Sequence, residues 1–285
     1  MKKVNYLNNK DILKEIHKSK NTYCSFIDRA DNAYDVIIHD IGKLKTKKFL
    51  TEAREARATR LSKEAFDAAK AEGQSVKADQ FTIDPADIKI TDVVFRLMTW
   101  DHIPEAELKP KKVDKTDPDA EEVHSEYDEE IPVKYAKVNF PPFQHFKIGE
   151  DGEPVCVAKS HWKGDLETGA FSKTHGGMTN KLAHMFMKLC ERYATRSNWR
   201  GYTYNDEMRS QALLQLSQIG LQFDESKSQN PFAYYTAAIT NSFTRVLNIE
   251  KRNQNIRDDI LEMNGLNPSY TRQGMSGGGA PTFEE

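Results

Sequence analysis

The sequence contains no long apolar run. No segment approaches the roughly 18 apolar residues of a membrane-spanning helix, and residues 1–5 have no apolar signal core behind their lysines. Cysteine is scarce as well: Cys24, Cys156 and Cys190 are odd in number and widely spaced, which is typical of reduced thiols rather than of a disulfide framework. These absences predict a soluble protein that is not secreted.

The chain also lacks an excess of either charge. Its 285 residues include 41 Lys and Arg and 43 Asp and Glu, a net charge of −2. This balance excludes a uniformly basic coat for nucleic acid but allows a local basic patch. Hydrophobic residues make up 38% of the chain, against a usual share of about 45–50%. The composition predicts a modest core with extended polar segments, in one large domain or two small ones.

Residues 1–30 predict a docking helix rather than a domain. Asn8 or Asn9 can cap a short helix from Asp11 to Lys18, in which three apolar side chains recur at helical spacing. Seven basic and three acidic residues also make this segment positively charged.

Residues 31–112 predict a helical insert. The stretch from Lys47 to Glu72 is rich in Ala, Glu, Arg and Lys and has no Gly or Pro, so its helix propensity is high. Its narrow apolar stripe indicates a largely exposed helix. The apolar stretch from Ile90 to Trp100 fits a buried helix or a strand equally well, because periodicity alone does not separate the two.

The middle of the chain predicts an acidic linker and a small β-rich segment. Residues 113–130 contain nine acids and one lysine, which favours a disordered spacer, with an acidic decoy for a DNA channel as the alternative. Residues 131–175 alternate apolar and polar side chains over Val133–Val138 and again over Val155–Ala158. A turn-prone stretch at 149–152 separates the two runs, so we expect a hairpin or meander.

Residues 176–262 predict a compact unit of three helices, followed by a flexible tail over 263–285. The first helix presents one continuous apolar face, made of Leu182, Met185, Phe186, Leu189, Cys190 and Tyr193. The second starts at Thr203, whose hydroxyl can cap it, and buries Met208, Ala212, Leu213, Leu216 and Ile219. The third starts at Asn230-Pro231, continues to about Arg257, and buries Phe232, Tyr235, Ile239, Phe243 and Val246. The predicted fold is mainly α, with a large, partly disordered α/β insert between the N-terminal helix and the three-helix unit.

The third helix carries the clearest signal of binding chemistry. Up to Arg257 it has four basic residues and one acid, a charge of +3. Amides and hydroxyls accompany these charges and suit contacts to phosphates and base edges; they belong to Thr240, Asn241, Thr244 and Asn248. Aromatic rings at the helix start can stack on unpaired bases, at about 1–3 kcal/mol each; they belong to Phe232, Tyr234 and Tyr235. The alternative is that these rings are core and the charges form a solvated face.

Several runs in this region resemble region 2 of the sigma-70 family, most of all the late-transcription sigma factors of T-even-type bacteriophages. The runs are Tyr204–Met208, Gly220–Asp224, Asn230–Tyr235 and Phe243–Leu247, with Asn8-Asn9-Lys10 near the N-terminus. The similarity covers roughly residues 180–260 and a short N-terminal piece. It implies a sigma region 2 fold for the three-helix unit and leaves residues 31–175 as an insertion.

The resemblance implies a phage sigma factor that binds the core RNA polymerase of its host and opens an A·T-rich, −10-like late promoter. Polymerase contact, on the clamp coiled coil of the largest subunit, falls on Glu207, Ser210, Gln211 and Ser217. Promoter contact falls on Tyr234, Tyr235, Asn241, Thr244, Arg245, Lys251 and Arg252. The tryptophan pair that wedges the duplex in primary sigma factors falls on Ala237 and Ala238, so melting depends on the tyrosines or is weaker. Such a protein has no catalytic activity and no cofactor, and it works in the cytoplasm of the infected bacterium.

Promoter binding of this kind implies helper proteins. No helix-turn-helix for a −35 element follows Arg257, and similar phage factors rely on a small coactivator and on the replication sliding clamp. The C-terminal tail, with Phe283 near its tip, is a clamp-binding peptide or a terminus without function.

Other function classes have weaker support in the sequence. His161, His175, His184 and Cys190 match no zinc spacing, so no metal is expected. The main alternative function is an adaptor, such as an appropriation or anti-sigma factor, that binds polymerase without reading DNA. A structural protein of the virion is a third reading.

Overall fold

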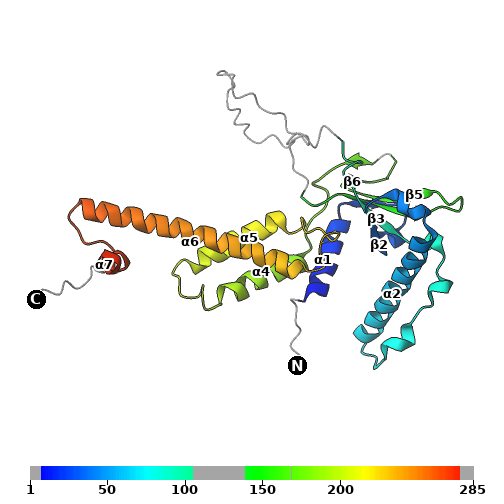
Figure 1. Cartoon of the computed structure of the whole chain (residues 1–285), viewed down its shortest axis with the longest axis horizontal. Helices are drawn as coiled ribbons and strands as arrows, with labels where there is room; N and C mark the ends of the chain where they lie inside the picture. Colours follow the sequence, from blue (N-terminus) through cyan, green and yellow to red (C-terminus); the bar gives the residue numbers. More distant parts are fainter. Residues whose placement is uncertain (1–7, 105–138, 168, 277–285) are drawn as a thin grey trace, which may run out of the picture. The chain divides into compact units, whose positions relative to one another are not determined.

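The computed structural model of the chain describes residues 8–104, 139–167 and 169–276 (Figure 1). The predicted acidic linker, the alternating run Val133–Val138 and the tail residue Phe283 lie outside the described residues. What is described is mainly α-helical with a small amount of sheet. It divides into a sheet unit, Asn9–Leu182 with Leu221–Gln229, and a helical unit that contains 183–220 and 230–276.

The sheet unit is built on a mixed sheet with the strand order β1-β5-β4-β3-β2. Its strands are β1 (Cys24–Phe26), β2 (Val36–Ile38), β3 (Phe95–Met98), β4 (Phe143–Ile148) and β5 (Pro154–Ser160). Strands β2 and β3 are parallel, and the other neighbours are antiparallel. A separate pair, β6 (Trp162–Lys163) and β7 (Ala170–Phe171), is also antiparallel. One sheet thus draws its strands from segments that the sequence analysis treated as separate.

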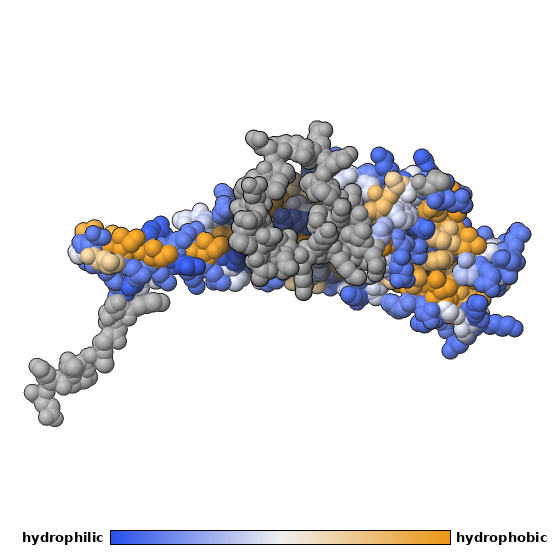
Figure 2. All heavy atoms as spheres, turned by 90° about the horizontal axis from the view of Figure 1, so that it is seen from above, coloured by the Kyte–Doolittle hydropathy of each residue, from blue (hydrophilic) through white to orange (hydrophobic). Residues whose placement is uncertain are grey.

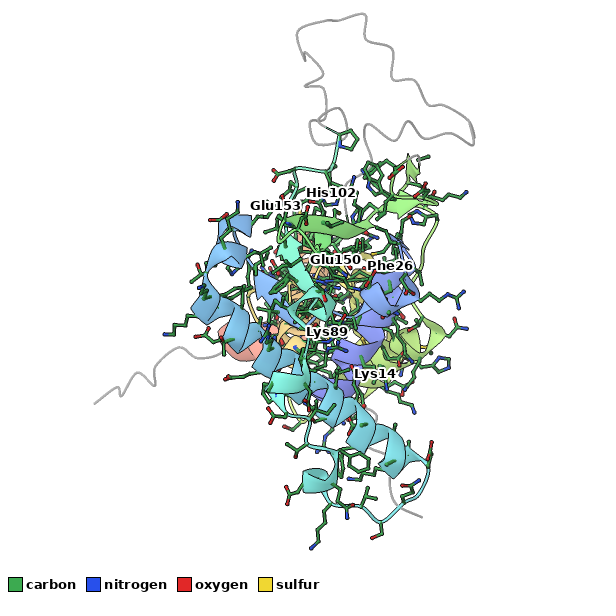
Figure 3. All side chains as sticks on the ribbon, turned by 90° about the vertical axis from the view of Figure 1, so that its right-hand side faces the viewer. Lys14, Phe26, Lys89, His102, Glu150 and Glu153 are labelled. Carbon is green, nitrogen blue, oxygen red and sulfur yellow. The ribbon has the colours of Figure 1, made fainter. Side chains whose placement is uncertain are left out.

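The sheet settles two predictions about strands. The turn predicted at 149–152 and the strand after it are confirmed: the turn joins β4 to β5 and carries Glu150 and Glu153 (Figure 3). Gly152 has a φ of +83° there, which favours glycine. The strand before the turn is β4 at Phe143–Ile148, which the alternating pattern did not predict. The stretch from Ile90 to Trp100 is not a buried α-helix: it contains the short 3-10 helix Ile90–Asp92 and then strand β3 at Phe95–Met98. Strand β3 lies between β2 and β4, where its backbone is paired on both sides.

Helix α2 (Lys47–Ala71) packs on one face of this sheet. The core on that face consists of Ile38, Leu44, Ala53, Val93, Phe95, Leu97, Phe146 and Ile148. The helix buries only three of its own residues, all alanines, so the prediction of a largely exposed helix is confirmed. Arg57 and Arg60 of α2 bind the buried carboxylate of Asp35 at 3.0 and 2.6 Å, which ties the helix to the start of β2.

Helix α1 runs from Asn9 to Asn21, longer at both ends than the predicted Asp11–Lys18. Its last turn is stabilised by tertiary contacts, since Ser19 and Lys20 are completely buried. The local sequence does not predict this burial, because serine and lysine are polar residues. Short 3-10 helices connect the elements of the sheet unit: η1 (Arg29–Asn32), η2 (Ile41–Lys45), η3 (Ala78–Phe81), η4 (Pro85–Asp87) and η5 (Ile90–Asp92).

The helical unit contains most of α4 (Asn180–Ala194), together with α5 (Asn205–Ile219), α6 (Pro231–Met263) and α7 (Tyr270–Ser276). Aromatic pairs join α4 to α6: Phe186 meets Tyr235 with ring centroids 4.7 Å apart, and Tyr193 meets Phe243 at 5.3 Å. Helix α5 also packs along α6 (Figure 1). The predicted apolar face of the first helix is confirmed, because all six of its residues are buried.

Two helix boundaries in the helical unit differ from the predictions. Helix α5 starts at Asn205, and no side chain caps it, so the predicted cap by Thr203 is wrong. The amide of Asn205 instead donates to the carbonyls of Ala194 and Trp199, at 3.1 and 2.9 Å, and this fixes the helix start. Helix α6 begins as predicted, with Asn230 accepting from the Ala233 amide, but it continues to Met263.

The predicted flexible tail is wrong over the residues that form α7. Asp258 of α6 accepts hydrogen bonds from both the backbone amide and the hydroxyl of Ser269, at 2.8 and 2.7 Å, just before α7 starts. Arg272 then bridges to Asp259 and Glu262 at 2.6 and 2.9 Å. These contacts fold the end of the described chain back onto α6.

Candidate nucleic-acid interface

The two tyrosines at the start of α6 have opposite environments. Tyr235 is completely buried, its ring lies against Phe186, and its hydroxyl donates to the carbonyl of Gly220. The prediction that Tyr235 contacts DNA is therefore wrong, because a base cannot reach a ring inside the core. Tyr234 is 36% exposed and stands edge-on to Tyr235, with ring centroids 5.2 Å apart. Only Tyr234 is accessible for stacking on a base.

A polar and basic face follows along the next turns of α6. Asn241, Thr244, Arg245, Asn248 and Arg252 are exposed and, with Ile249, line one shallow hollow of the surface. They recur at intervals of three, four and seven residues, so they share one face of the helix. We name these five polar residues the α6 polar face. The α6 polar face contains four of the predicted DNA contacts: Asn241, Thr244, Arg245 and Arg252. Lys251, another predicted contact, is exposed but does not line the hollow.

Thr240 does not belong to the α6 polar face. Its hydroxyl bonds the hydroxyl of Tyr193 on α4 and donates to the carbonyl of Thr236 at 2.8 Å. This residue stabilises the packing of α4 on α6 instead. Thr240 and Asn241 are adjacent polar residues, so the sequence alone does not show that they lie on different faces of α6.

The full length of α6 changes its charge from the predicted value. The last two turns add Asp258, Asp259 and Glu262, so acids and bases are equal in number over the helix. Positive and negative charges are separated along the helix axis. The bases lie in the middle of α6, and these three acids lie in its last turns, where they contact Ser269 and Arg272. Acids at a helix C-terminus oppose the helix dipole, and Arg272 offsets that cost. The middle of α6 therefore keeps a local positive charge.

Helix α5 presents the residues predicted to bind polymerase. Glu207, Ser210, Gln211 and Ser217 are all exposed, and the Gln211 amide donates to Glu207 at 3.2 Å. The sequence analysis missed Leu214, which lies among them and is 54% exposed. An apolar side chain amid polar ones gives such a face an anchor for a protein partner. The sequence did offer a signal for Leu214: it follows Leu213 directly, and only Leu213 was predicted to be buried.

A buried cluster of charges occupies the face of the sheet opposite α2, and the sequence analysis missed it. Lys20 of α1 binds Glu225 at 2.7 Å and the carbonyl of Phe223 at 2.7 Å. Arg96 of β3 and His17 of α1 lie 4.0 and 3.6 Å from the same carboxylate. Lys20, Arg96 and Glu225 are each at most 2% exposed. The cluster holds the segment after α5 within the sheet unit.

Aromatic rings surround the guanidinium of Arg96. Its carbon lies 4.0 Å from the ring centre of Tyr34 and 3.8 Å from that of Phe143. Its Nε donates to His145 Nε2 at 3.0 Å, and His145 Nδ1 bonds the carbonyl of Asp31 at 2.7 Å. Such stacking on both faces suits an arginine better than a lysine. The only sequence signal was a charged residue inside the apolar run of β3.

The electrostatics of the cluster follow from its burial. Burial by itself raises the pKa of Glu225, but Lys20 and Arg96 outweigh that effect and lower the pKa to about 2. Burial, followed by the charge of Arg96, lowers the pKa of His17 to about 4 and that of His145 well below 6.5. Both histidines are therefore neutral at pH 7. Because Lys20, Arg96 and Glu225 are buried, the cluster supports the fold rather than a reaction.

The structure does not bring His161, His175, His184 and Cys190 together as a metal site. Within the described ranges, no group of three or more His, Cys, Asp or Glu side chains is placed to hold a metal ion. His161 instead packs on Phe140, with ring centroids 4.2 Å apart, and burial lowers its pKa to about 3. Cys190 is buried on the apolar face of α4.

Comparison with known proteins gives no match among protein-family models, curated proteins or solved structures. The resemblance to sigma region 2 therefore stays a prediction that rests on the quoted residues. Over the part of the chain that the structure describes, no helix has the length and apolar character to cross a membrane.

Proposed function

We propose that this chain is a sigma-like transcription initiation factor that directs a bacterial RNA polymerase to A·T-rich, −10-like promoters. The observation that carries the proposal is the α6 polar face, with Tyr234 exposed about two turns before its first residue, Asn241, on the same helix. Amides, hydroxyls and arginines on one exposed helical face suit phosphates and base edges. The proposed fold of α4, α5 and α6 is a three-helix bundle of the sigma region 2 type.

The proposal gives each residue of this face a role. Tyr234 stacks on an unpaired base of the non-template strand, because its ring is the accessible one of the pair. Asn241 and Thr244 approach base edges, and Arg245 and Arg252 hold phosphates. Ala237 and Ala238 are too small to wedge the duplex, so opening depends on Tyr234 and on the polymerase.

Helix α5 is the proposed polymerase contact. Its exposed Glu207, Ser210, Gln211 and Ser217 surround Leu214, which combines a polar rim with one apolar anchor. The partner is the clamp coiled coil of the largest polymerase subunit. The protein has no catalysis of its own, it acts in the cytoplasm of an infected bacterium, and a small coactivator and the sliding clamp are its proposed helpers.

Run-off transcription with core polymerase tests the proposal. Adding the chain should yield a transcript from a defined start on a supercoiled A·T-rich template. Tyr234→Ala should reduce permanganate reactivity of the opened strand more than initial promoter binding. Tyr270→Ala, which removes an 89% exposed tyrosine from α7, is the matched control. The absence of any start-specific transcript would overturn the proposal.

A second experiment tests the polymerase contact. Glu207→Arg should weaken binding of the chain to core polymerase, since it reverses a charge on the proposed face. Glu191→Arg makes the same change on the exposed side of α4 and should bind normally. Equal binding by both variants would place the contact elsewhere.

The adaptor without DNA readout is the second candidate, and Leu214 is the observation that favours it. An exposed leucine serves a protein partner whether or not DNA is read. An adaptor would bind polymerase through α5 but protect no promoter DNA. Footprinting of the −10 strand therefore separates the two candidates.

A further inference from the structure

One face of α6 is buried in the first half of the helix and exposed in the second. Tyr235, Ile239 and Val246 are at most 6% exposed where α4 and α5 accompany the helix. Beyond them the same face continues as an apolar seam, with exposed fractions of 48% for Ile249, 46% for Ile256, 54% for Ile260 and 85% for Met263. Figure 1 shows α6 extending past α4 and α5, and Figure 2 shows orange surface along this free half. The apolar pattern of α6 therefore continues beyond the part of the helix that α4 and α5 cover.

Helix α7 folds back on α6 without covering the seam. Ser269, just before α7, contacts Gln254 and Asp258 of α6, and Arg272 of α7 contacts Asp259 and Glu262. At 100° per residue, Asp258 is on the side of the helix opposite the line from Ile249 to Ile260. The seam is therefore open along about four turns of helix.

The spacing of the seam is that of a coiled coil. Val246, Asn253 and Ile260 recur every seven residues, and so do Ile249, Ile256 and Met263, offset from the first set by three. In a heptad these are the a and d positions that meet a partner helix. The one polar member, Asn253, is typical of an a position that sets register, and its amide donates to Glu250 at 3.3 Å.

We propose that this seam pairs with the same seam of a second copy of the chain, as an antiparallel coiled coil. In the register where Asn253 of each copy lies opposite Ile256 of the other, Ile249 of each copy lies opposite Ile260 of the other. The same register places Glu250 beside the other copy's Arg257, and Arg252 beside its Asp259. Each flanking contact therefore joins opposite charges, and each occurs twice.

The parallel arrangement fits these charges less well. It would place Arg252 of one copy beside Arg257 of the other on both sides of the seam, although it would also place Arg245 beside Glu250. Like charges at such flanking positions are a device that proteins use against wrong pairings. Charge complementarity thus favours a second copy in the antiparallel direction, where both flanking pairs join opposite charges.

Sedimentation of the full chain over a range of concentrations tests the proposal. We expect a reversible dimer, which Ile256→Asp weakens at least about tenfold in Kd, equivalent to about 1.4 kcal/mol. Circular dichroism should show an unchanged helix content, because Ile256 is exposed in the single chain. Leu214→Asp is the matched control: it changes a 54% exposed leucine of the same unit away from the seam and should dimerise normally. A chain that stays monomeric, or a dimer indifferent to Ile256→Asp, overturns the proposal.

A charge swap tests the direction of pairing. Glu250→Arg alone sets Arg against Arg257, and Arg257→Glu alone sets Glu against Glu250, so each should weaken the dimer about tenfold or more. The double variant restores opposite charges in the antiparallel pair and should recover wild-type dimerisation. A parallel pair gives the opposite result for Arg257→Glu, which would tighten that dimer because position 257 would then face Arg252. A tighter dimer of this single variant therefore also overturns the antiparallel arrangement. Failure of the double variant to recover overturns the antiparallel arrangement.

Discussion

The charged cluster of the sheet unit and the arginines of the α6 polar face stand in opposite environments. Lys20, Arg96 and Glu225 are removed from water and lie beside one another, whereas Arg245 and Arg252 on α6 are exposed. Buried charges cost desolvation and become strongly destabilising when one partner is lost. Exposed charges cost little and remain available to a ligand. The comparison teaches that net charge says nothing about how a chain uses its charges.

The largest expected effect comes from breaking the buried cluster. Glu225→Gln keeps the size of the side chain but leaves Lys20 and Arg96 without a counter-charge. We expect a loss of about 3–5 kcal/mol in the free energy of unfolding, measured by chemical denaturation. Glu153→Gln removes an acid from the exposed pair with Lys45 and should cost at most about 0.5 kcal/mol. Similar losses for both variants would erase the distinction between the buried and the exposed charges.

A second effect concerns acid. Since His17, His145 and His161 have lowered pKa values in the folded chain, the unfolded chain takes up protons first as the pH falls below about 6.5. Stability is full above that pH and should fall by on the order of 2 kcal/mol for each of these histidines as the pH drops from about 6.5 to 4. The low pKa of Glu225 extends the loss from pH 4.5 down to about 2.

Denaturation at a series of pH values measures this dependence. His161→Asn should flatten the decline, because it removes one titrating ring. Asparagine tolerates the φ of 69° found at position 161. A profile that is level between pH 7 and 5 in the wild-type chain would contradict the expectation.

The paired tyrosines give a smaller effect within the helical unit. Tyr235→Phe removes a buried hydroxyl bond to the Gly220 carbonyl and should cost about 1 kcal/mol. Tyr234→Phe changes a partly exposed hydroxyl and should stay within about 0.5 kcal/mol. Thermal unfolding of the two variants side by side measures the difference. The reverse order would mean that Tyr234 is the core residue.

The smallest effect on stability belongs to the α6 polar face. Arg245→Gln with Arg252→Gln should change the free energy of unfolding by less than about 0.5 kcal/mol. If these arginines hold phosphates, the salt dependence of promoter binding by the polymerase complex should lose about two units of slope. Lys48→Gln with Lys63→Gln makes the same charge change on α2 and should leave that slope intact. An unchanged slope in the α6 variant would remove phosphate contact from its roles.

Local patterns predicted much of the helical unit. The apolar face of α4 and the Asn230 cap of α6 follow from residues within a few positions of one another, and so does the turn between β4 and β5. The end of α6 was placed too early, because the contacts that stabilise its last turns come from Ser269 and Arg272.

The sequence by itself determined where α4 forms, where α6 begins and where the turn between β4 and β5 lies, because periodicity, capping and turn signals act between neighbours. Only the tertiary structure decided that Tyr235 is core while Tyr234 is accessible, since adjacent aromatic residues carry the same local signal. It also decided that Lys20 meets Glu225 across 205 positions of sequence and that strands from distant segments form one sheet. Burial and charge pairing depend on which distant groups arrive together, and no spacing along the chain encodes that.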